Sequence, residues 1–232
     1  MLLYYPIMNE KNSKMVEEMF AAGAHFGYSK SKRHPSCKDY IYGTKNSYDI
    51  INLEKTEEQI TKAKEKLKEI FAKKGRVIFV ASKAEIKDLA PAIAECENIS
   101  YVNTRWIGGT LTNFGEIRKR VNKLKKLMED SEKGEFSKYT KKEALGFEKE
   151  IIKLKKYYFG LLDLIKKPDA LVVVDAKDES IAVKEAQDKG VEVIALVNTD
   201  TDISKLDYPI VINDRSRDAL EFVSKELFSD CK

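Results

Sequence analysis

The strongest constraint on the fold of this chain is a set of short apolar runs that contain no polar residue. Val77–Ala81, Ala170–Val174 and Val193–Val197 are runs of this kind, which are typical of strands buried on both faces of a parallel sheet. Shorter extended segments at Ser100–Asn103 and Pro209–Ile212 predict two further strands. The sequence therefore predicts about five parallel strands.

Amphipathic segments separate these strands, and the resulting alternation indicates the fold class. Helices are predicted over residues 54–73, 83–95, 180–189 and 216–228, with a further helix at 14–22. Strand–helix–strand units of this kind connect with right-handed crossovers and place helices on both faces of the sheet. We expect a three-layer α/β domain formed by residues 14–113 and 162–232.

Residues 114–161 interrupt the alternation with two helical segments. Apolar residues recur every three or four positions in each of them, at Phe114, Ile117, Val121, Leu124 and Met128, and again at Phe147, Ile151, Leu154, Tyr158 and Leu161. Between them lie Gly134, suited to a turn, and Thr140-x-x-Glu143, a capping-box pattern. This arrangement predicts an inserted antiparallel coiled-coil hairpin, with arms of about fifteen residues that extend about 20 Å.

Positive charge is concentrated in the inserted segment. Between Gly115 and Gly160 there are fourteen basic and eight acidic residues, an excess of six positive charges, whereas the whole chain has a net charge of +4 and the remainder therefore sums to −2. A basic arm that projects from a small domain favours a docking role over a merely solvated surface.

The rest of the composition indicates a cytoplasmic protein. The chain is 43% hydrophobic and 34% charged, and no apolar run approaches the length of a membrane span. Its three cysteines are widely separated, which suits a reducing cytoplasm. Residues 1–13 lack the basic leader and cleavage site of a signal peptide, and we expect them to form a flexible leader.

The sequence gives little support for a phosphate-binding site, a zinc site or a nucleophilic catalytic site. The strand ending at Ala81 is followed by no glycine-rich phosphate loop, and Asp175 opens an acidic turn that would repel phosphate. His25, His34 and Cys37, with Asp214 as a distant fourth candidate, do not have the spacing of a zinc site. No Gly-x-Ser-x-Gly motif occurs, so we predict no catalytic residue, no metal and no cofactor.

Interleaved basic and aromatic residues point instead to RNA. Lysines and an arginine alternate with tyrosines between residues 28 and 48, and a guanidinium adjoins the single tryptophan in the loop Asn103–Phe114. Such mixtures supply phosphate contacts and stacking surface together, and the loop's Gly-Gly pair permits close backbone approach. The predicted RNA-binding residues are Lys30, Lys32, Arg33, Lys38, Lys45, Arg105, Trp106, Thr110, Asn113, Arg118, Arg120 and Lys123.

Several segments, in order along the chain, resemble one family. They are His25-Phe26-Gly27, Ile50 to Thr56 (IINLEKT), Asn103 to Asn113 (NTRWIGGTLTN), Lys141 to Ala144 (KKEA) and Pro168 to Leu171 (PDAL), with Asp175 followed by Ile181-Ala182-x-Lys184-Glu185-Ala186. Together they resemble the universal small-subunit ribosomal protein family number two, bacterial type. The resemblance runs from about Lys14 to Val223.

This resemblance implies a flavodoxin-like fold and a structural, non-enzymatic role in the small ribosomal subunit. The implied partners are small-subunit ribosomal RNA, neighbouring ribosomal proteins and the large S-one protein that captures messenger RNA, and the implied location is the cytoplasmic ribosome. Two alternatives remain open from the residues themselves. One is a nucleotide- or sugar-phosphate-binding α/β enzyme that uses the strand ends near Asp175, and the other is a cytosolic adaptor that grips a protein through the hairpin.

Overall fold

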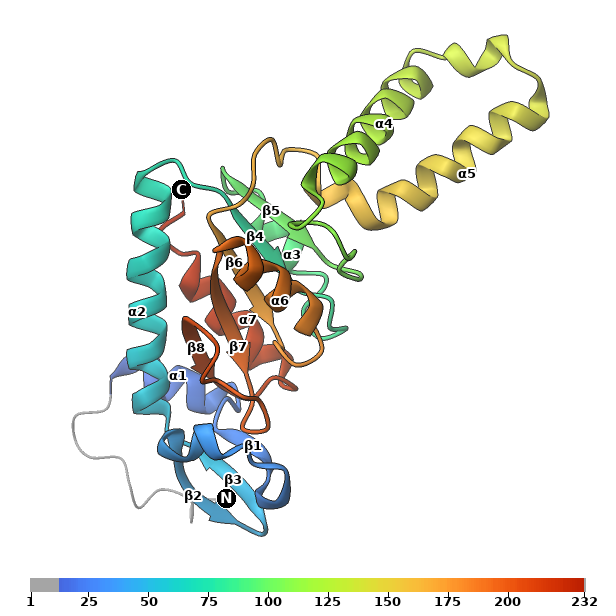
Figure 1. The fold of residues 1–232 in the computed structure, drawn as a ribbon. Helices are drawn as coiled ribbons and strands as arrows, with labels where there is room; N and C mark the ends of the chain where they lie inside the picture. The colour runs from blue at the N-terminus through green and yellow to red at the C-terminus, as the bar shows by residue number, and fades with distance from the viewer. Residues whose placement is uncertain (1–12, 232) are drawn as a thin grey trace.

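The computed structural model describes residues 13–231 and has a five-stranded parallel sheet at its centre (Figure 1). The strand order is β5-β4-β6-β7-β8. The strands are β4 (Val77–Val80), β5 (Ile99–Val102), β6 (Ala170–Val174), β7 (Glu192–Val197) and β8 (Tyr208–Val211). The parallel flavodoxin-like α/β fold expected from the sequence is confirmed.

The apolar runs form strands because both of their faces are covered. Every residue of β4 and β6 is buried. Val77 and Phe79 of β4 belong to the apolar cluster of one face, whereas Ile78 and Val80 belong to that of the other. Alternate side chains of one strand thus enter two cores, which gives the molecule three layers.

The helices divide between the two faces. The first core is covered by α1 (Lys14–Ala21), α2 (Leu53–Ala72), α3 (Ala90–Ile93) and α7 (Arg217–Leu227). The second core is covered by α6 (Ser180–Lys189), by the loop before α4 (Phe114–Glu132) and by the near ends of α4 and α5 (Lys141–Tyr158). Side-chain caps begin several of these helices, as at α2, where the Asn52 side chain accepts hydrogen bonds from the amides of Glu54 and Lys55.

Helices α4 and α5 lie side by side and project from the globular body as an arm, residues 114–161 (Figure 1). Gly134 ends the first helix with a positive φ of 70°, and the Thr140–Glu143 capping box begins the second. Buried side chains of the arm, such as Val121 and Leu154, belong to the same core as the sheet strands. The near end of the arm is therefore continuous with the body, and the coiled-coil description of its full length remains a prediction.

One predicted helix is shorter than expected. The sequence pattern predicts a helix over residues 83–95, but only Ala90–Ile93 is helical and the preceding residues form turns. Pro91 explains the difference, because proline has no amide hydrogen and its ring clashes with the carbonyl four residues earlier. Proline is tolerated only in the first turn, so the helix begins next to it.

A small antiparallel sheet lies at the end of the body away from the arm (Figure 1). It consists of β1 (Phe26–Ser29), β3 (Tyr48–Ile51) and β2 (Ile41–Lys45), in that order. The sheet and the short 3-10 helices beside it carry one of the three groups of predicted RNA-binding residues. The leader predicted for residues 1–13 lies outside the described residues except for Ser13, whose side chain caps α1.

Candidate nucleic-acid interface

The loop Asn103–Phe114 is organised by a single carboxylate from α6. The Glu185 carboxylate accepts hydrogen bonds from the amides of Gly109 at 2.6 Å, Leu111 at 2.9 Å and Thr112 at 3.1 Å. Burial alone would raise the pKa of Glu185, but the amide hydrogen bonds outweigh it and hold the pKa below its ordinary value. An ionised carboxylate thus fixes the loop that joins β5 to the arm.

This arrangement divides the predicted loop residues into buried and exposed ones. Trp106 is 3% exposed and Thr110 is 1% exposed, and the Thr110 hydroxyl donates to the carbonyl of Ile107 at 2.6 Å. Their side chains therefore support the loop from inside the core. Arg105 and Asn113 are exposed, so these two can reach a partner.

The small sheet carries a second group, which we call the small-sheet basic region: Lys30, Lys32, Arg33, Lys38 and Lys45. All four lysines are exposed. Arg33 is bound to the fully buried Asp49 through both its Nε, at 2.7 Å, and its terminal nitrogen. Arg33 therefore secures the turn, while the four lysines face solvent.

The arm contributes the third group. Arg120 is exposed, whereas Arg118 donates a hydrogen bond at 2.7 Å to the carbonyl of Leu164 and Lys123 pairs with Glu150 of α5. Arg118 and Lys123 thus also tie the two helices of the arm to each other and to the body.

Positive charge is not spread evenly along the arm. Residues 115–125 and 153–160, which we call the arm base, contain eight basic residues and one acidic residue, whereas residues 126–152 contain six basic and seven acidic residues. The excess positive charge therefore lies where the arm joins the body. Arg105 belongs to the same region, since its neighbour Thr104 donates a hydrogen bond at 2.8 Å to the carbonyl of Lys156.

The structure does not gather the three predicted groups into one patch. The arm base and Arg105 lie together, but the small sheet occupies the other end of the body (Figure 1). Two separated basic regions suit a large partner that extends along the molecule.

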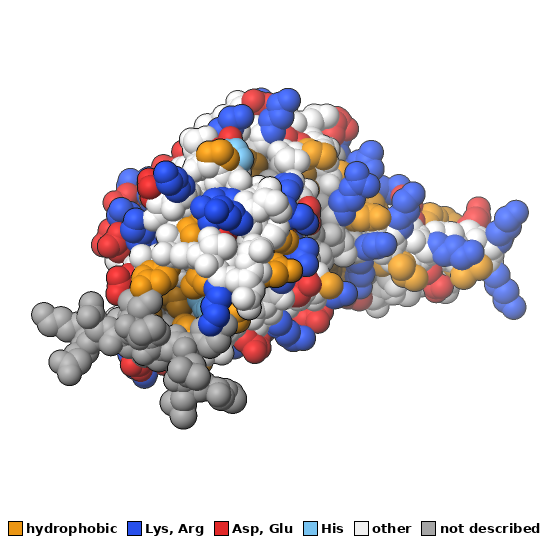
Figure 2. Space-filling view, turned by 90° about the horizontal axis from the view of Figure 1, so that it is seen from below, with side chains coloured by type: hydrophobic (Ala, Val, Ile, Leu, Met, Phe, Trp, Pro, Cys, Tyr) orange, Lys and Arg blue, Asp and Glu red, His pale blue; other side chains and the backbone are white. Residues whose placement is uncertain are grey.

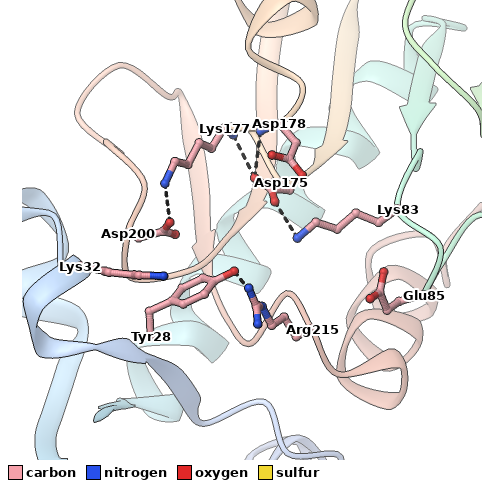
Figure 3. Close-up of a pocket in the computed structure, with 9 residues that line it drawn as sticks. All are labelled: Tyr28, Lys32, Lys83, Glu85, Asp175, Lys177, Asp178, Asp200 and Arg215. Carbon is pink, nitrogen blue, oxygen red and sulfur yellow. Dashed lines mark hydrogen bonds and ion pairs between the residues drawn. The ribbon is translucent and has the colours of Figure 1, made fainter. Parts of the chain in front are cut away.

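The carboxyl ends of the strands form a cleft of about 800 Å³, which the sequence identified only through Asp175. Lys83 lines this cleft, and its Nζ lies 2.6 Å from Asp175 (Figure 3). The same Nζ lies 2.5 Å from Asp214. Asn198 donates a further hydrogen bond at 2.7 Å to the Asp214 carboxylate. We call this strand-end group the lysine triad, meaning Lys83, Asp175 and Asp214.

Ion pairing sets the protonation states of the triad. Burial disfavours the charged forms of Lys83 and Asp175, but their mutual hydrogen bond and charge attraction outweigh that cost. The pKa of Lys83 is consequently raised and that of Asp175 lowered. A carboxylate held in this way is a poor general base, because its charge is already neutralised by the adjacent ammonium.

The rim of the cleft links the small sheet to the main sheet. Arg215 donates a hydrogen bond at 2.9 Å to the Tyr28 hydroxyl and lies 4.8 Å from the centre of its ring (Figure 3). Lys32 approaches the same ring at 5.7 Å. Tyr28 therefore stacks with cations of the protein itself, and its side chain is engaged in joining the two sheets.

His25, His34 and Cys37, the candidate metal ligands of the sequence, each have different surroundings in the structure. His25 stacks on Phe20 with ring centres 4.2 Å apart, and burial lowers its pKa. His34 lies beside Ser36, and burial raises the pKa of Cys37 to about 11. Among residues 13–231 no group of three or more histidine, cysteine, aspartate or glutamate side chains is placed to hold a metal ion. In the same part of the chain, no helix has the length and apolar character needed to cross a bilayer.

Fold and site together define a class of protein: a flavodoxin-like α/β body that carries a projecting helical arm with a basic base. The family model for ribosomal protein S2 matches residues 19–231. The small ribosomal subunit protein uS2 of Vibrio cholerae is 41% identical over 202 residues, which cover 87% of this chain and 84% of that protein. The protein of the same name from Fusobacterium nucleatum is 39% identical over 200 residues, covering 86% of this chain and 81% of its own. The chain belongs to the ribosomal protein S2 family.

Proposed function

We propose that this protein is a structural component of the small ribosomal subunit that binds ribosomal RNA through the arm base and the small-sheet basic region. One observation carries the proposal: in a chain of the ribosomal protein S2 family, the excess positive charge is concentrated at the arm base beside the exposed Arg105. In this proposal the chain also contacts neighbouring ribosomal proteins.

The mechanism follows from the placement of the charges. Exposed cations neutralise phosphates and release the counterions that surround RNA. Glu185 holds the backbone of the loop at Gly109 and Leu111, so less backbone entropy is lost when the loop that carries Arg105 meets a phosphate. Because the two basic regions lie at separate ends of the body, they would hold two RNA segments at a fixed spacing.

The strand-end cleft does not favour the enzyme alternative. Asp175, the residue on which that alternative rests, is paired with Lys83 and accepts hydrogen bonds from the amides of Lys177 and Asp178. Four basic and four acidic side chains line the cleft, so it offers no net positive charge to a phosphate. The triad is better explained as an internal ion-pair network.

Binding to protein-free small-subunit ribosomal RNA at increasing salt tests the proposal. The logarithm of the affinity should fall linearly with the logarithm of the salt concentration. Substituting Arg105, Arg120 and Lys153 together with alanine should reduce the slope by about one for each phosphate that the variant no longer neutralises. Lys62→Ala, an exposed lysine on α2, is the control. An affinity that does not change with salt would contradict the proposed mechanism.

A further inference from the structure

The outer side of α5 carries an apolar stripe that the protein itself leaves uncovered. Leu145 is 50% exposed, Ile152 70% and Phe159 45%. These residues, which we call the α5 stripe, are spaced seven apart. At 100° per residue Leu145 and Ile152 lie about 160–180° around the helix from the buried Leu154, on the side away from α4, and Phe159 directly follows the last residue of α5.

A row of lysines runs beside this stripe with the same spacing. Lys142, Lys149 and Lys156 are all exposed and are each seven residues apart. Among residues 13–231, Lys142 and Lys149 have no ion-pair partner, although ion pairs are common elsewhere on the molecule. In Figure 2 hydrophobic and basic side chains intermingle along the projecting arm.

Apolar residues flanked by charges at seven-residue intervals are the pattern by which one helix recognises another. The apolar stripe would pack against the apolar side of a second helix, and the lysine row would pair with acidic residues flanking that side. We propose that the outer side of α5 docks an acidic amphipathic helix of a neighbouring protein. This inference rests on the proposed function, which places the chain in the small subunit. It adds the class of partner that binds the outer side of α5.

Other occupants fit the surface less well. RNA would use the lysines, but aliphatic Leu145 and Ile152 offer no stacking surface to bases. The segment 126–152, which holds most of the stripe, has seven acidic and six basic residues and so attracts phosphate weakly as a whole. A second copy of this chain, paired antiparallel about a two-fold axis, would set the lysine row against itself.

Photo-cross-linking of the full-length chain tests the inference. The photo-reactive residue p-benzoylphenylalanine replaces Ile152 and, in a control chain, Ile181, an isoleucine of α6 that is 53% exposed. After irradiation of producing cells, small subunits are isolated and cross-linked peptides are sequenced by mass spectrometry. We expect position 152, and not position 181, to capture a segment with apolar residues at helical spacing and flanking glutamates or aspartates.

A binding measurement then separates specific docking from mere proximity. The captured segment, made as a synthetic peptide, should bind the isolated full-length chain at least tenfold more tightly than it binds the Lys142→Glu, Lys149→Glu, Lys156→Glu triple variant. Replacing the acidic residues of the peptide with lysines should restore binding to that variant. Circular dichroism of the variant checks that α5 remains helical.

Each other outcome overturns the inference. These are cross-links from position 152 to RNA, to a second copy of the chain, to a segment without acidic residues or to nothing. An affinity that the triple variant leaves unchanged has the same consequence. If the chain is absent from small subunits but position 152 still captures an acidic helix in the lysate and the peptide binds as expected, the proposed function fails while the docking inference stands.

Discussion

At the scale of single residues, Glu185 organises the loop of the candidate interface. Its carboxylate is the acceptor for three backbone amides of the loop Asn103–Phe114. Glu185→Gln places an amide group, itself a donor, against these donors, and a buried donor left without a partner costs about 1–3 kcal/mol. Urea unfolding at neutral pH should show a loss of stability of that size, whereas Asp188→Asn, at an exposed position of the same helix, should show little change.

Glu185 also makes the folding stability depend on pH, in a direction that its lowered pKa determines. The folded pKa of Glu185 is lowered, so its contribution to stability is fully present above the unfolded pKa and is lost as the pH falls through the folded pKa. The difference between the parent chain and Glu185→Gln should therefore shrink in acid. A difference that stays constant from neutral pH to below the ordinary glutamate range would show that the carboxylate charge is unimportant.

The lysine triad provides a second prediction at this scale. Lys83→Met leaves the carboxylates of Asp175 and Asp214 buried without their shared cation, and breaking a buried pair in this way costs about 3–5 kcal/mol. The loss should be largest at neutral pH and smaller in acid, where one carboxylate takes up a proton. Thermal or urea unfolding measures it, with the exposed Lys87→Met as the control. Equal stability of the two variants would contradict this account of the cleft.

At the scale of elements, the arm base and the arm tip have separable roles. Replacing residues 126–152 with a short glycine–serine linker keeps Val121, Leu124, Leu154 and Tyr158, which are buried in the core of the body. The linker needs to span only the 8–10 Å between packed helices, about four residues. The removed segment also contains Leu127, Met128 and Ile151, which are partly buried against that core, so urea unfolding should show a loss of about 1–3 kcal/mol while the body stays folded.

RNA affinity provides the second measurement on this variant. The removed segment has one more acidic than basic residue, so affinity for small-subunit ribosomal RNA should be nearly unchanged. Replacing Arg120 and Lys153 of the arm base with alanine in the full-length chain should weaken it clearly. A large loss of RNA affinity on removing the tip alone would place the interface further out along the arm.

The elements also show what could be predicted from the sequence. The five strands were predictable because runs such as Ala170–Val174 are apolar at every position, a pattern set by burial on both faces. The small sheet was not, because β1 and β2 contain Gly27 and Gly43 and show no clean alternation of buried and exposed residues. The helix predicted over 83–95 is too long because Pro91 cannot stand in a helix interior and so excludes the turns that precede Ala90.

The site was less predictable than the fold, because its residues are joined by tertiary contacts. Glu185 lies 73 to 76 positions from the amides that it binds, and Lys83 lies 131 positions from Asp214. No local pattern carries such pairings. The charge excess of the arm was readable from the sequence, but its concentration beside Arg105 requires the antiparallel packing of α4 and α5, which brings residues 115–125 and 153–160 together.

At the scale of the whole molecule, the body keeps two basic regions apart. The small sheet is attached to the strand ends through Tyr28 and Arg215, and the arm is attached through the core beneath the sheet. The first attachment combines a hydrogen bond with the stacking of the Arg215 guanidinium on the Tyr28 ring, and the second consists of buried apolar side chains. The spacing between the basic regions is therefore a property of the fold. A structural protein of a ribonucleoprotein particle needs this rigidity more than it needs a reactive site.

Sedimentation of a tagged full-length chain through a density gradient, from cells that produce it, tests the central claim most directly. We predict that most of the chain migrates with small ribosomal subunits at low salt and moves to the free-protein fractions as salt is raised. Combined substitution of Arg105, Arg120 and Lys153 with alanine should shift that release to lower salt, while Lys62→Ala should not. A folded chain that stays in the free-protein fractions even at low salt would contradict the account.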